Sequence, residues 1–208
     1  MMVAPRPPPR PRANYSNSME RSAAILTRLT KLTDTSLIVH WFTADAGLIK
    51  TVAKGARNPK SSFAGKLDLF FSAEINWARS RRSELHSLRE VSPENCRPAI
   101  RRDYDCTLLA AYFCRLLENA VEREHPEPGL HDLLGRALNH VDQEGASTRA
   151  IRHFEHELAH RLGLAHEKRH AAPALRDALG GLPPLREQLF DRLEDRGRFR
   201  FPSDDSGA

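Results

Sequence analysis

The spacing of apolar residues changes near residue 95, and this change limits the folds that are open to the chain. Residues 21–92 alternate between polar residues and β-branched or aromatic ones, a period of two that is typical of half-buried strands. Turn-forming residues divide this part into five predicted strands, at 23–32, 37–47, 48–57, 67–80 and 84–91. The first part of the chain is therefore predicted to be all β.

After Pro93 and Pro98 the apolar period becomes 3.6, which indicates helices. Residues 99–124 contain neither Gly nor Pro and are predicted to form one long amphipathic helix. Further helices are predicted at 130–143, 147–164 and 183–197, the second of them with Ser147 as its N-cap.

Together these patterns predict an α+β chain. Residues 19–95 are predicted to form a five-stranded β-barrel of the oligonucleotide-binding (OB) type, and residues 96–200 a helical domain. Residues 1–18, which are rich in Pro and Arg, and residues 201–208 are predicted to be disordered tails. Because Met19 stands directly before the first strand, a translation start at Met19 is an alternative to a genuine N-terminal tail.

Positive charge is concentrated in the predicted barrel. Residues 21–95 carry twelve Lys and Arg against seven Asp and Glu, whereas residues 96–208 carry seventeen against nineteen. No acidic residue lies between Asp45 and Asp68. The candidate nucleic-acid-binding residues are the basic residues of this stretch and of the turn after the fourth strand: Lys50, Lys54, Arg57, Lys60, Lys66, Arg81 and Arg82. Such a surface favours a polyanionic partner, although a merely solvated face explains the same charges equally well.

The barrel region also contains aromatic residues that are candidates for stacking on bases, as in other barrels that bind single strands. These are Trp41, Phe42, Phe63, Phe70, Phe71 and Trp77. Most of the six are expected to lie in the core, which leaves one or two for stacking.

Residues 156–166, HELAHRLGLAH, match the zinc-binding spacing H-E-x-x-H-x-x-G-x-x-H. With His156, His160 and His166 as ligands and Glu157 as general base, a zinc metalloprotease is the alternative function. However, the apolar stripe of helix 147–164 faces away from His156 and His160, which are predicted to be exposed. The methionine turn that follows the zinc helix in such proteases is also missing, since Met19 is the last methionine. No metal site is predicted.

Three further features bear on location and cofactors. Cys96, Cys106 and Cys114 form neither an even set nor a C-x-x-C pair, which favours reduced thiols. No apolar run approaches the roughly 20 residues that span a bilayer, and no signal peptide is recognisable, so a cytoplasmic protein without a membrane partner is expected. Residues 53–60, AKGARNPK, have too few glycines for a phosphate-binding loop, so no cofactor is expected.

Several short motifs resemble those of one family. A Thr-x-x-x-Gly turn, an Ala-Lys-Gly-Ala-Arg segment, a Pro-Lys-Ser and a Leu-x-x-Phe follow one another at 43–47, 53–57, 59–61 and 67–70. In this order they resemble the N-terminal domain of the RecO family of bacterial recombinational repair proteins. Phe154, Glu155, Leu158, Leu162 and Gly163 resemble the family's Phe-Glu-x-x-Leu-Leu-x-x-Leu-Gly helix, so that the resemblance covers residues 20–165.

The resemblance implies a mediator of recombination that is not an enzyme. RecO-like proteins bind single- and double-stranded DNA, anneal complementary strands, contact the C-terminal tail of the single-strand binding protein (SSB), and act with RecR to load RecA. It implies the same partners here and a location at the bacterial nucleoid. Many relatives carry a four-cysteine zinc module after the Phe-Glu helix, but residues 165–184 contain no Cys. A scaffold whose barrel binds protein instead of DNA is a further alternative.

Overall fold

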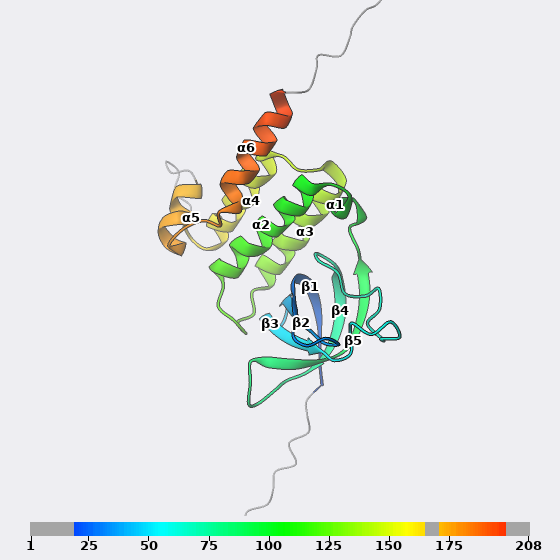
Figure 1. Cartoon of the computed structure of the whole chain (residues 1–208). Coiled ribbons are helices and arrows are strands. Elements are labelled where there is room, and N and C mark those ends of the chain that lie inside the picture. The colour runs from blue at the N-terminus through cyan, green and yellow to red at the C-terminus, as the bar shows by residue number, and fades with distance from the viewer. Residues whose placement is uncertain (1–18, 165–170, 199–208) are drawn as a thin grey trace, which may run out of the picture.

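The structure, a computed structural model, describes residues 19–164 and 171–198, so the predicted tails at 1–18 and 201–208 lie outside the described residues. A β-barrel forms one half of the molecule and a group of helices covers one side of it (Figure 1). The strands are β1 (Met19–Lys31), β2 (Leu37–Thr43), β3 (Gly47–Ala53), β4 (Ser72–Ala78) and β5 (Leu85–Asn95).

All five predicted strands are present, and they close into a barrel in the order β1-β2-β3-β5-β4. This confirms the predicted α+β class with an N-terminal OB-type barrel. Neighbouring strands are antiparallel except β3 and β5, which pair in parallel. The long strand β1 pairs with β4 along its first half and with β2 along its second half. The fourth strand is shorter than predicted, because the chain turns at residues 69–70, where Phe70 has a φ of 67°.

The helices are α1 (Pro98–Arg102), α2 (Tyr104–Ala120), α3 (Pro128–Glu144), α4 (Thr148–Arg161), α5 (Ala171–Leu179) and α6 (Leu185–Arg198). The prediction of one helix over 99–124 is wrong, because the extended residue Asp103 separates α1 from α2 and α2 ends at Ala120. The Asp103 carboxylate accepts the backbone N–H groups of Asp105 and Cys106 at 2.8 and 3.0 Å, which makes it the N-cap of α2. Helix α5 was not predicted.

The helix over 147–164 is confirmed as α4, and so is its N-cap, since Ser147 Oγ accepts the backbone N–H of Ala150 at 3.1 Å. None of the described helices is long and apolar enough to cross a membrane.

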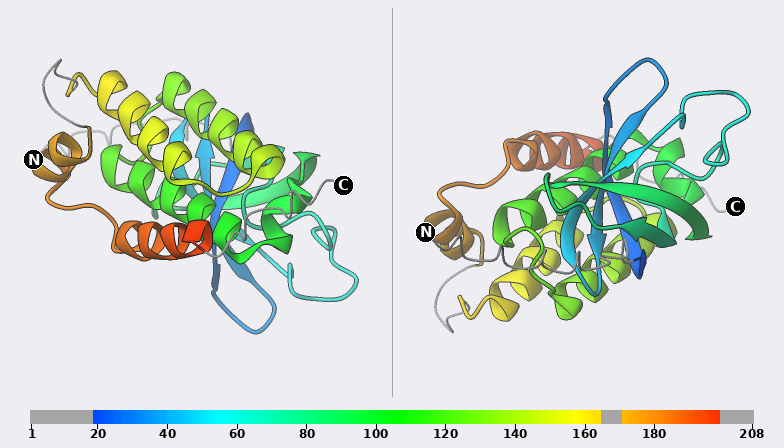
Figure 2. Two further views of the ribbon diagram at one scale, coloured as in Figure 1. Left: turned by 90° about the horizontal axis from the view of Figure 1, so that it is seen from above. Right: turned by 90° about the horizontal axis from the view of Figure 1, so that it is seen from below.

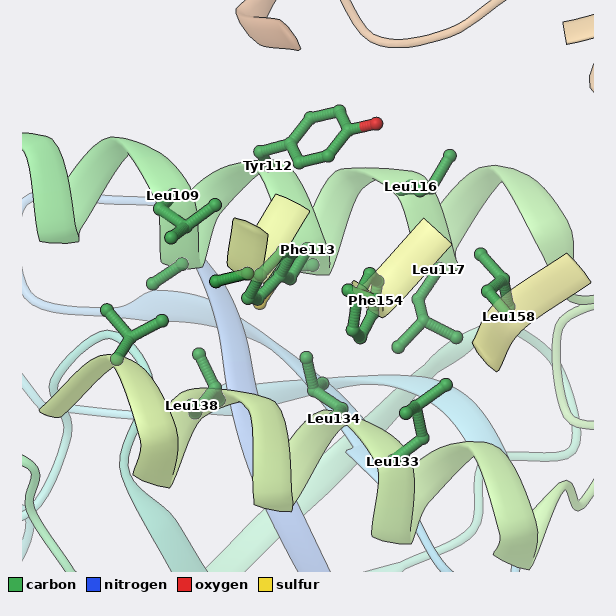
Figure 3. Close-up of a cluster of buried hydrophobic side chains, with 14 of the residues drawn as sticks. Leu109, Tyr112, Phe113, Leu116, Leu117, Leu133, Leu134, Leu138, Phe154 and Leu158 are labelled. Carbon is green, nitrogen blue, oxygen red and sulfur yellow. The ribbon is translucent and has the colours of Figure 1, made fainter. Parts of the chain in front are cut away.

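The helices share an apolar core to which α2, α3 and α4 contribute (Figure 3). At its centre the rings of Phe113 and Phe154 stack with their centroids 4.1 Å apart. Ile25 and Phe42 of the barrel belong to the same cluster, whereas Trp41 and Trp77 lie in a separate cluster inside the barrel. The helices therefore pack directly on the outside of the barrel and leave its interior closed.

Arg97, in the connection between β5 and α1, fixes the helices to the barrel. Its backbone is left-handed, with a φ of 44°, and its side chain is buried. The guanidinium donates to the Phe70 carbonyl at 2.5 Å, to Ser72 Oγ at 2.9 Å and to Asn139 Oδ1 of α3 at 2.8 Å. A buried charge is stable only when it is hydrogen-bonded in this way, so Arg97 sets the relative position of barrel and helices.

Candidate nucleic-acid interface

The connection between β3 and β4 carries four of the seven predicted binding residues, and it is an ordered loop. Gly55 (φ 70°) turns the chain directly after β3, and Phe63 packs its ring into the barrel core. The loop extends beyond the barrel beside the β1–β2 loop (Figure 2). Lys54, Lys60 and Lys66 are exposed on it, and none of the three has an ion-pair partner among the described residues.

Arg57 has a different role from these lysines, although it is also exposed. Its guanidinium donates to the carbonyls of Thr33 and Asp34 at 3.4 and 3.0 Å, and its backbone N–H donates to the Thr35 carbonyl at 3.0 Å. Arg57 therefore ties the β3–β4 loop to the β1–β2 loop and holds the lysines in place.

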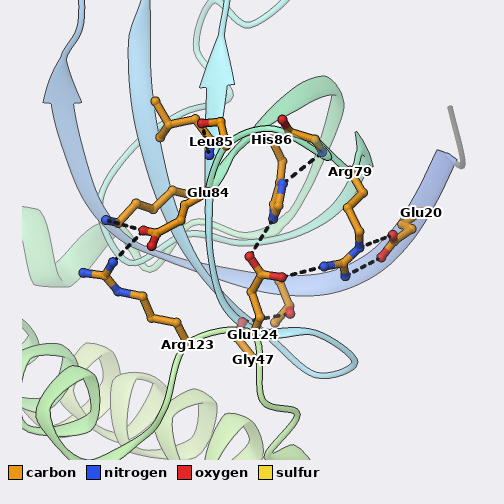
Figure 4. A network of polar contacts seen from close by, with 12 residues as sticks. Glu20, Gly47, Arg79, Glu84, Leu85, His86, Arg123 and Glu124 are labelled. Atoms are coloured by element: carbon orange, nitrogen blue, oxygen red, sulfur yellow. Dashed lines mark hydrogen bonds and ion pairs between the residues drawn. The ribbon is translucent and has the colours of Figure 1, made fainter.

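Arg81 and Arg82 lie exposed on the β4–β5 loop, apart from the lysines. The base of this loop is fixed by a polar network (Figure 4). Arg79 donates to Glu20 of β1 at 2.7 Å and to Glu124 of the α2–α3 connection at 2.6 Å. His86 is buried and accepts the Ser80 backbone N–H on Nδ1 at 3.2 Å, while its Nε2 lies 3.3 Å from Glu124.

Lys50 stands in the middle of β3 and points outward, since residues alternate between the two faces of a strand. Strand register places it opposite His40 of β2, and His40 opposite Arg28 of β1. The three side chains form a row across the outer face of the barrel. This row lies in an open groove of about 290 Å³, whose other wall is the end of α2 with Glu118 and the following connection with Arg123.

Burial lowers the pKa of His40 below its usual range, and the charge of neighbouring Arg28 acts in the same direction. Sequence reasoning found Lys50 but missed Arg28, His40 and Arg123, because only the strand register and the docking of the helices bring them to one place.

None of the six barrel aromatics is available for stacking on bases. Trp41, Phe42, Phe63, Phe70, Phe71 and Trp77 are all at most 7% exposed. The expectation that one or two of them would stack on bases is therefore wrong. Among the described residues the exposed large apolar side chains are Met19, Leu32 and Tyr104.

The HELAH stretch lies on the last turns of α4. His156 and His160 are exposed, as predicted, while Phe154 and Leu158 are buried on the opposite face. Gly163 follows the helix with a φ of 70°. The third histidine of the motif, His166, lies outside the described residues, and within them no group of three His, Cys, Asp or Glu side chains is placed to hold a metal ion.

A second depression, of about 490 Å³, lies between α3 and α4. Phe113, Leu133 and Phe154 are among its apolar lining, while Arg136 and Arg149 are among its basic lining. Sequence reasoning did not indicate it, since its residues come from three helices that are separate in the chain.

A closed OB-type barrel that is joined to helices, with loop lysines that have no ion-pair partner among the described residues, is an architecture found among nucleic-acid-binding proteins. Comparison with known families identifies the family to which the chain belongs. Residues 18–97 match the family model for the N-terminal part of recombination protein O, and residues 101–172 match that for its C-terminal part. The chain belongs to the RecO family, whose role is in DNA repair and recombination.

Individual RecO proteins are also similar to this chain. The chain is similar to the DNA repair protein RecO of Syntrophotalea carbinolica, with 33% identity over 54% of this chain and 44% of the relative. The RecO protein of Alkalilimnicola ehrlichii is 35% identical over 62% of this chain and 49% of the relative. That of Syntrophus aciditrophicus is 28% identical over 67% and 54%. The chain thus spans about half the length of the curated relatives it matches.

Proposed function

We propose that this chain is a DNA-binding recombination mediator. It binds single- and double-stranded DNA, anneals complementary strands, and with RecR helps to load RecA on DNA that SSB covers. The supporting observation is that Lys54, Lys60 and Lys66 stand exposed on an anchored loop without an acidic partner in the described part of the chain. Such cations neutralise phosphates and release counterions, which gives affinity for any sequence and a strong dependence on salt.

In this proposal the chain acts without covalent chemistry. Annealing requires that two strands are brought together with their charge reduced, and for this a basic surface suffices. No cofactor takes part, and the protein acts in the cytoplasm at the nucleoid. The zinc metalloprotease is not favoured, because residues 18–97 and 101–172, which include the HELAHRLGLAH stretch, match the models of the RecO family.

The α3–α4 depression is the place that we propose for the C-terminal tail of SSB. Any such tail ends in a carboxylate, which suits Arg136 and Arg149, while its apolar side chains suit the surface of Phe113 and Phe154. Replacing Arg149 by Glu should abolish binding of a peptide with the SSB tail sequence and leave binding of naked DNA intact. Undiminished peptide binding by this variant would contradict the assignment.

The decisive experiment removes the three loop lysines. The triple variant Lys54→Ala, Lys60→Ala, Lys66→Ala should bind single-stranded DNA more weakly for every sequence tested and anneal strands more slowly. The slope of log K against log salt should fall by up to about two, at roughly 0.7 for each phosphate contact. Arg57 is left unchanged because its loss would also release the loop.

The control replaces the same number of exposed arginines on α4 and α5, with Arg152→Ala, Arg161→Ala and Arg176→Ala. If a folded lysine variant keeps the affinity and slope of this control, the loop does not bind DNA. RecR or another protein is then its partner, as in the scaffold alternative.

A further inference from the structure

The groove beside Lys50 contains a carboxylate held between two cations from different parts of the molecule. Glu84, on the β4–β5 loop, accepts a hydrogen bond from Arg123 Nη1 at 2.7 Å and lies 3.9 Å from Lys50 Nζ (Figure 4). Lys50 belongs to β3, and Arg123 to the connection between α2 and α3. A place where two cations face one oxygen anion is also suited to the oxygens of a phosphate.

Glu84 is held only weakly in this place. Its side chain is 69% exposed and that of Arg123 is 61% exposed, so their ion pair is a solvent-screened surface pair that stabilises this arrangement only slightly. Lys50 is different, since its side chain is only 27% exposed and its contact with Glu84 is long. A half-buried cation attracts an anion more strongly than one in open solvent. A competing anion therefore displaces Glu84 at little cost.

The other acids beside these two cations, Glu118 and Glu124, do not compete for them, because Glu118 pairs with Arg28 and Glu124 with Arg79. Glu118 accepts a hydrogen bond from the Thr27 hydroxyl at 3.0 Å and pairs with Arg28. This pair neutralises the Arg28 end of the row that Arg28, His40 and Lys50 form. At the near end, Lys50 and Arg123 face a single exposed carboxylate, and His40 stands beside Lys50. The positive charge that is available to a ligand is thus located at Lys50 and Arg123.

We propose that Lys50 and Arg123 bind a backbone phosphate of single-stranded nucleic acid, in a site that Glu84 occupies while the chain is free. This deepens the proposed function and rests on it. Lys50 and Arg123 line both the groove of about 290 Å³ and an adjoining hollow of about 220 Å³ that Glu84 also lines, which is room for part of one strand. A duplex is stiffer than a single strand and reaches these two recessed cations less easily. A strand held there can follow β3 toward Lys54, which comes directly after the end of β3 at Ala53. Arrival of the phosphate displaces the Glu84 side chain, while the contacts of Arg79 and His86 still hold the base of the β4–β5 loop.

Because Glu84 is proposed to compete with the phosphate, the site can be tested both by a gain and by a loss of affinity. Binding of a fluorescent oligo-dT and of a duplex is measured against salt for the full chain and three single variants. Glu84→Gln, which removes the competitor, should raise affinity for oligo-dT about two- to fivefold. Lys50→Gln and Arg123→Gln should each lower it and reduce the salt slope by about 0.7. Affinity for the duplex should change less in all three variants.

Two matched controls separate the site from the effect of net charge. Glu90→Gln removes an exposed carboxylate whose amide partner is Asn76, and Arg176→Gln removes an exposed cation on α5. The inference is wrong if Glu84→Gln gains no more affinity than Glu90→Gln, or if Lys50→Gln and Arg123→Gln behave like Arg176→Gln. In that case the proposed function still stands, provided that the unaltered chain binds DNA and the loop-lysine variant loses affinity. An unaltered chain that does not bind DNA would overturn both proposals.

Discussion

The barrel and the helical region use their charged residues differently. The helices bury several of them in fully bonded contacts: Glu155 of α4 is 1% exposed and binds Tyr112 at 2.5 Å and Arg186 at 2.6 Å. On the barrel, Lys54, Lys60 and Lys66 stand in solvent without ion-pair partners among the described residues. The same kinds of residue therefore have different consequences. Loss of a buried charge from the helices should mainly reduce stability, whereas loss of an exposed lysine from the barrel should mainly reduce DNA binding.

The largest effect is expected from Glu155→Ala. Burial and the Glu155 carboxylate raise the pKa of Tyr112, so its hydroxyl stays protonated and donates, and the Arg186 guanidinium completes the network. Removing the carboxylate leaves Arg186 and Tyr112 without their partner, which should lower the free energy of unfolding by about 3–5 kcal/mol. Urea denaturation measures this loss. Glu187→Ala, an exposed glutamate of α6, is the control and should change stability by less than about 0.5 kcal/mol. A similar result for both variants would remove the distinction between the two regions.

The second prediction tests how tightly the two regions are joined. Gly47 has a φ of 67°, and a Cβ at this position would lie 2.1 Å from the backbone carbonyl oxygen of His125. Gly65 has a φ of 72° but no atom within 4 Å of its Cβ position. Gly65→Ala should therefore lose only the roughly 1–2 kcal/mol of a left-handed Ala. Gly47→Ala should lose at least about 1 kcal/mol more by thermal or urea unfolding, because the α2–α3 connection must move away.

The affinity for single-stranded DNA is a second quantity that distinguishes Gly47→Ala from Gly65→Ala. The displaced connection carries Arg123, so affinity for single-stranded DNA should fall in Gly47→Ala but not in Gly65→Ala. Equal stability of the two variants would mean that the helices dock on the barrel more loosely than the contact at Gly47 indicates.

The two regions also differed in how well the sequence predicted them. The barrel strands could be predicted because each has one buried face, so its pattern has a period of two that is visible locally. The apolar pattern continues across Asp103 and therefore does not predict the break there. The break is still recognisable, because Asp is a preferred N-cap residue and the acidic Asp105 follows in the first turn of α2. The groove could not be predicted at all. Arg28, His40 and Lys50 come together only through strand register, and Arg123 only through the docking of α2 and α3.

A third prediction concerns pH. Burial lowers the pKa of His40 and His86 on the barrel and of His131 on α3 below the ordinary value. The unfolded chain therefore binds more protons than the folded one below about pH 6.5. Stability should be fully present above that pH and fall as the pH decreases toward the lowered pKa values. Protonation of His86 would also put a proton on Nδ1, which now accepts the Ser80 backbone N–H, so this hydrogen bond would be lost.

Unfolding free energies between pH 7.5 and 5.5 measure this effect. His86→Gln should flatten the decline, whereas His153→Gln, at an exposed position of α4, should leave it unchanged. A decline that is the same in both variants would show that His86 does not contribute to it.

The smallest effect is expected from the double variant His156→Ala and His160→Ala. Both side chains are exposed on α4 and face away from Phe154 and Leu158, so their loss leaves no cavity and no buried partner. The free energy of unfolding and the affinity for DNA should each change by less than about 0.5 kcal/mol. Unfolding is measured with and without added Zn²⁺, because the zinc-binding spacing of the stretch is a definite alternative. A stabilisation by zinc that the double variant loses would show that these histidines hold a metal. The helical region would then carry a metal site on the exposed face of α4.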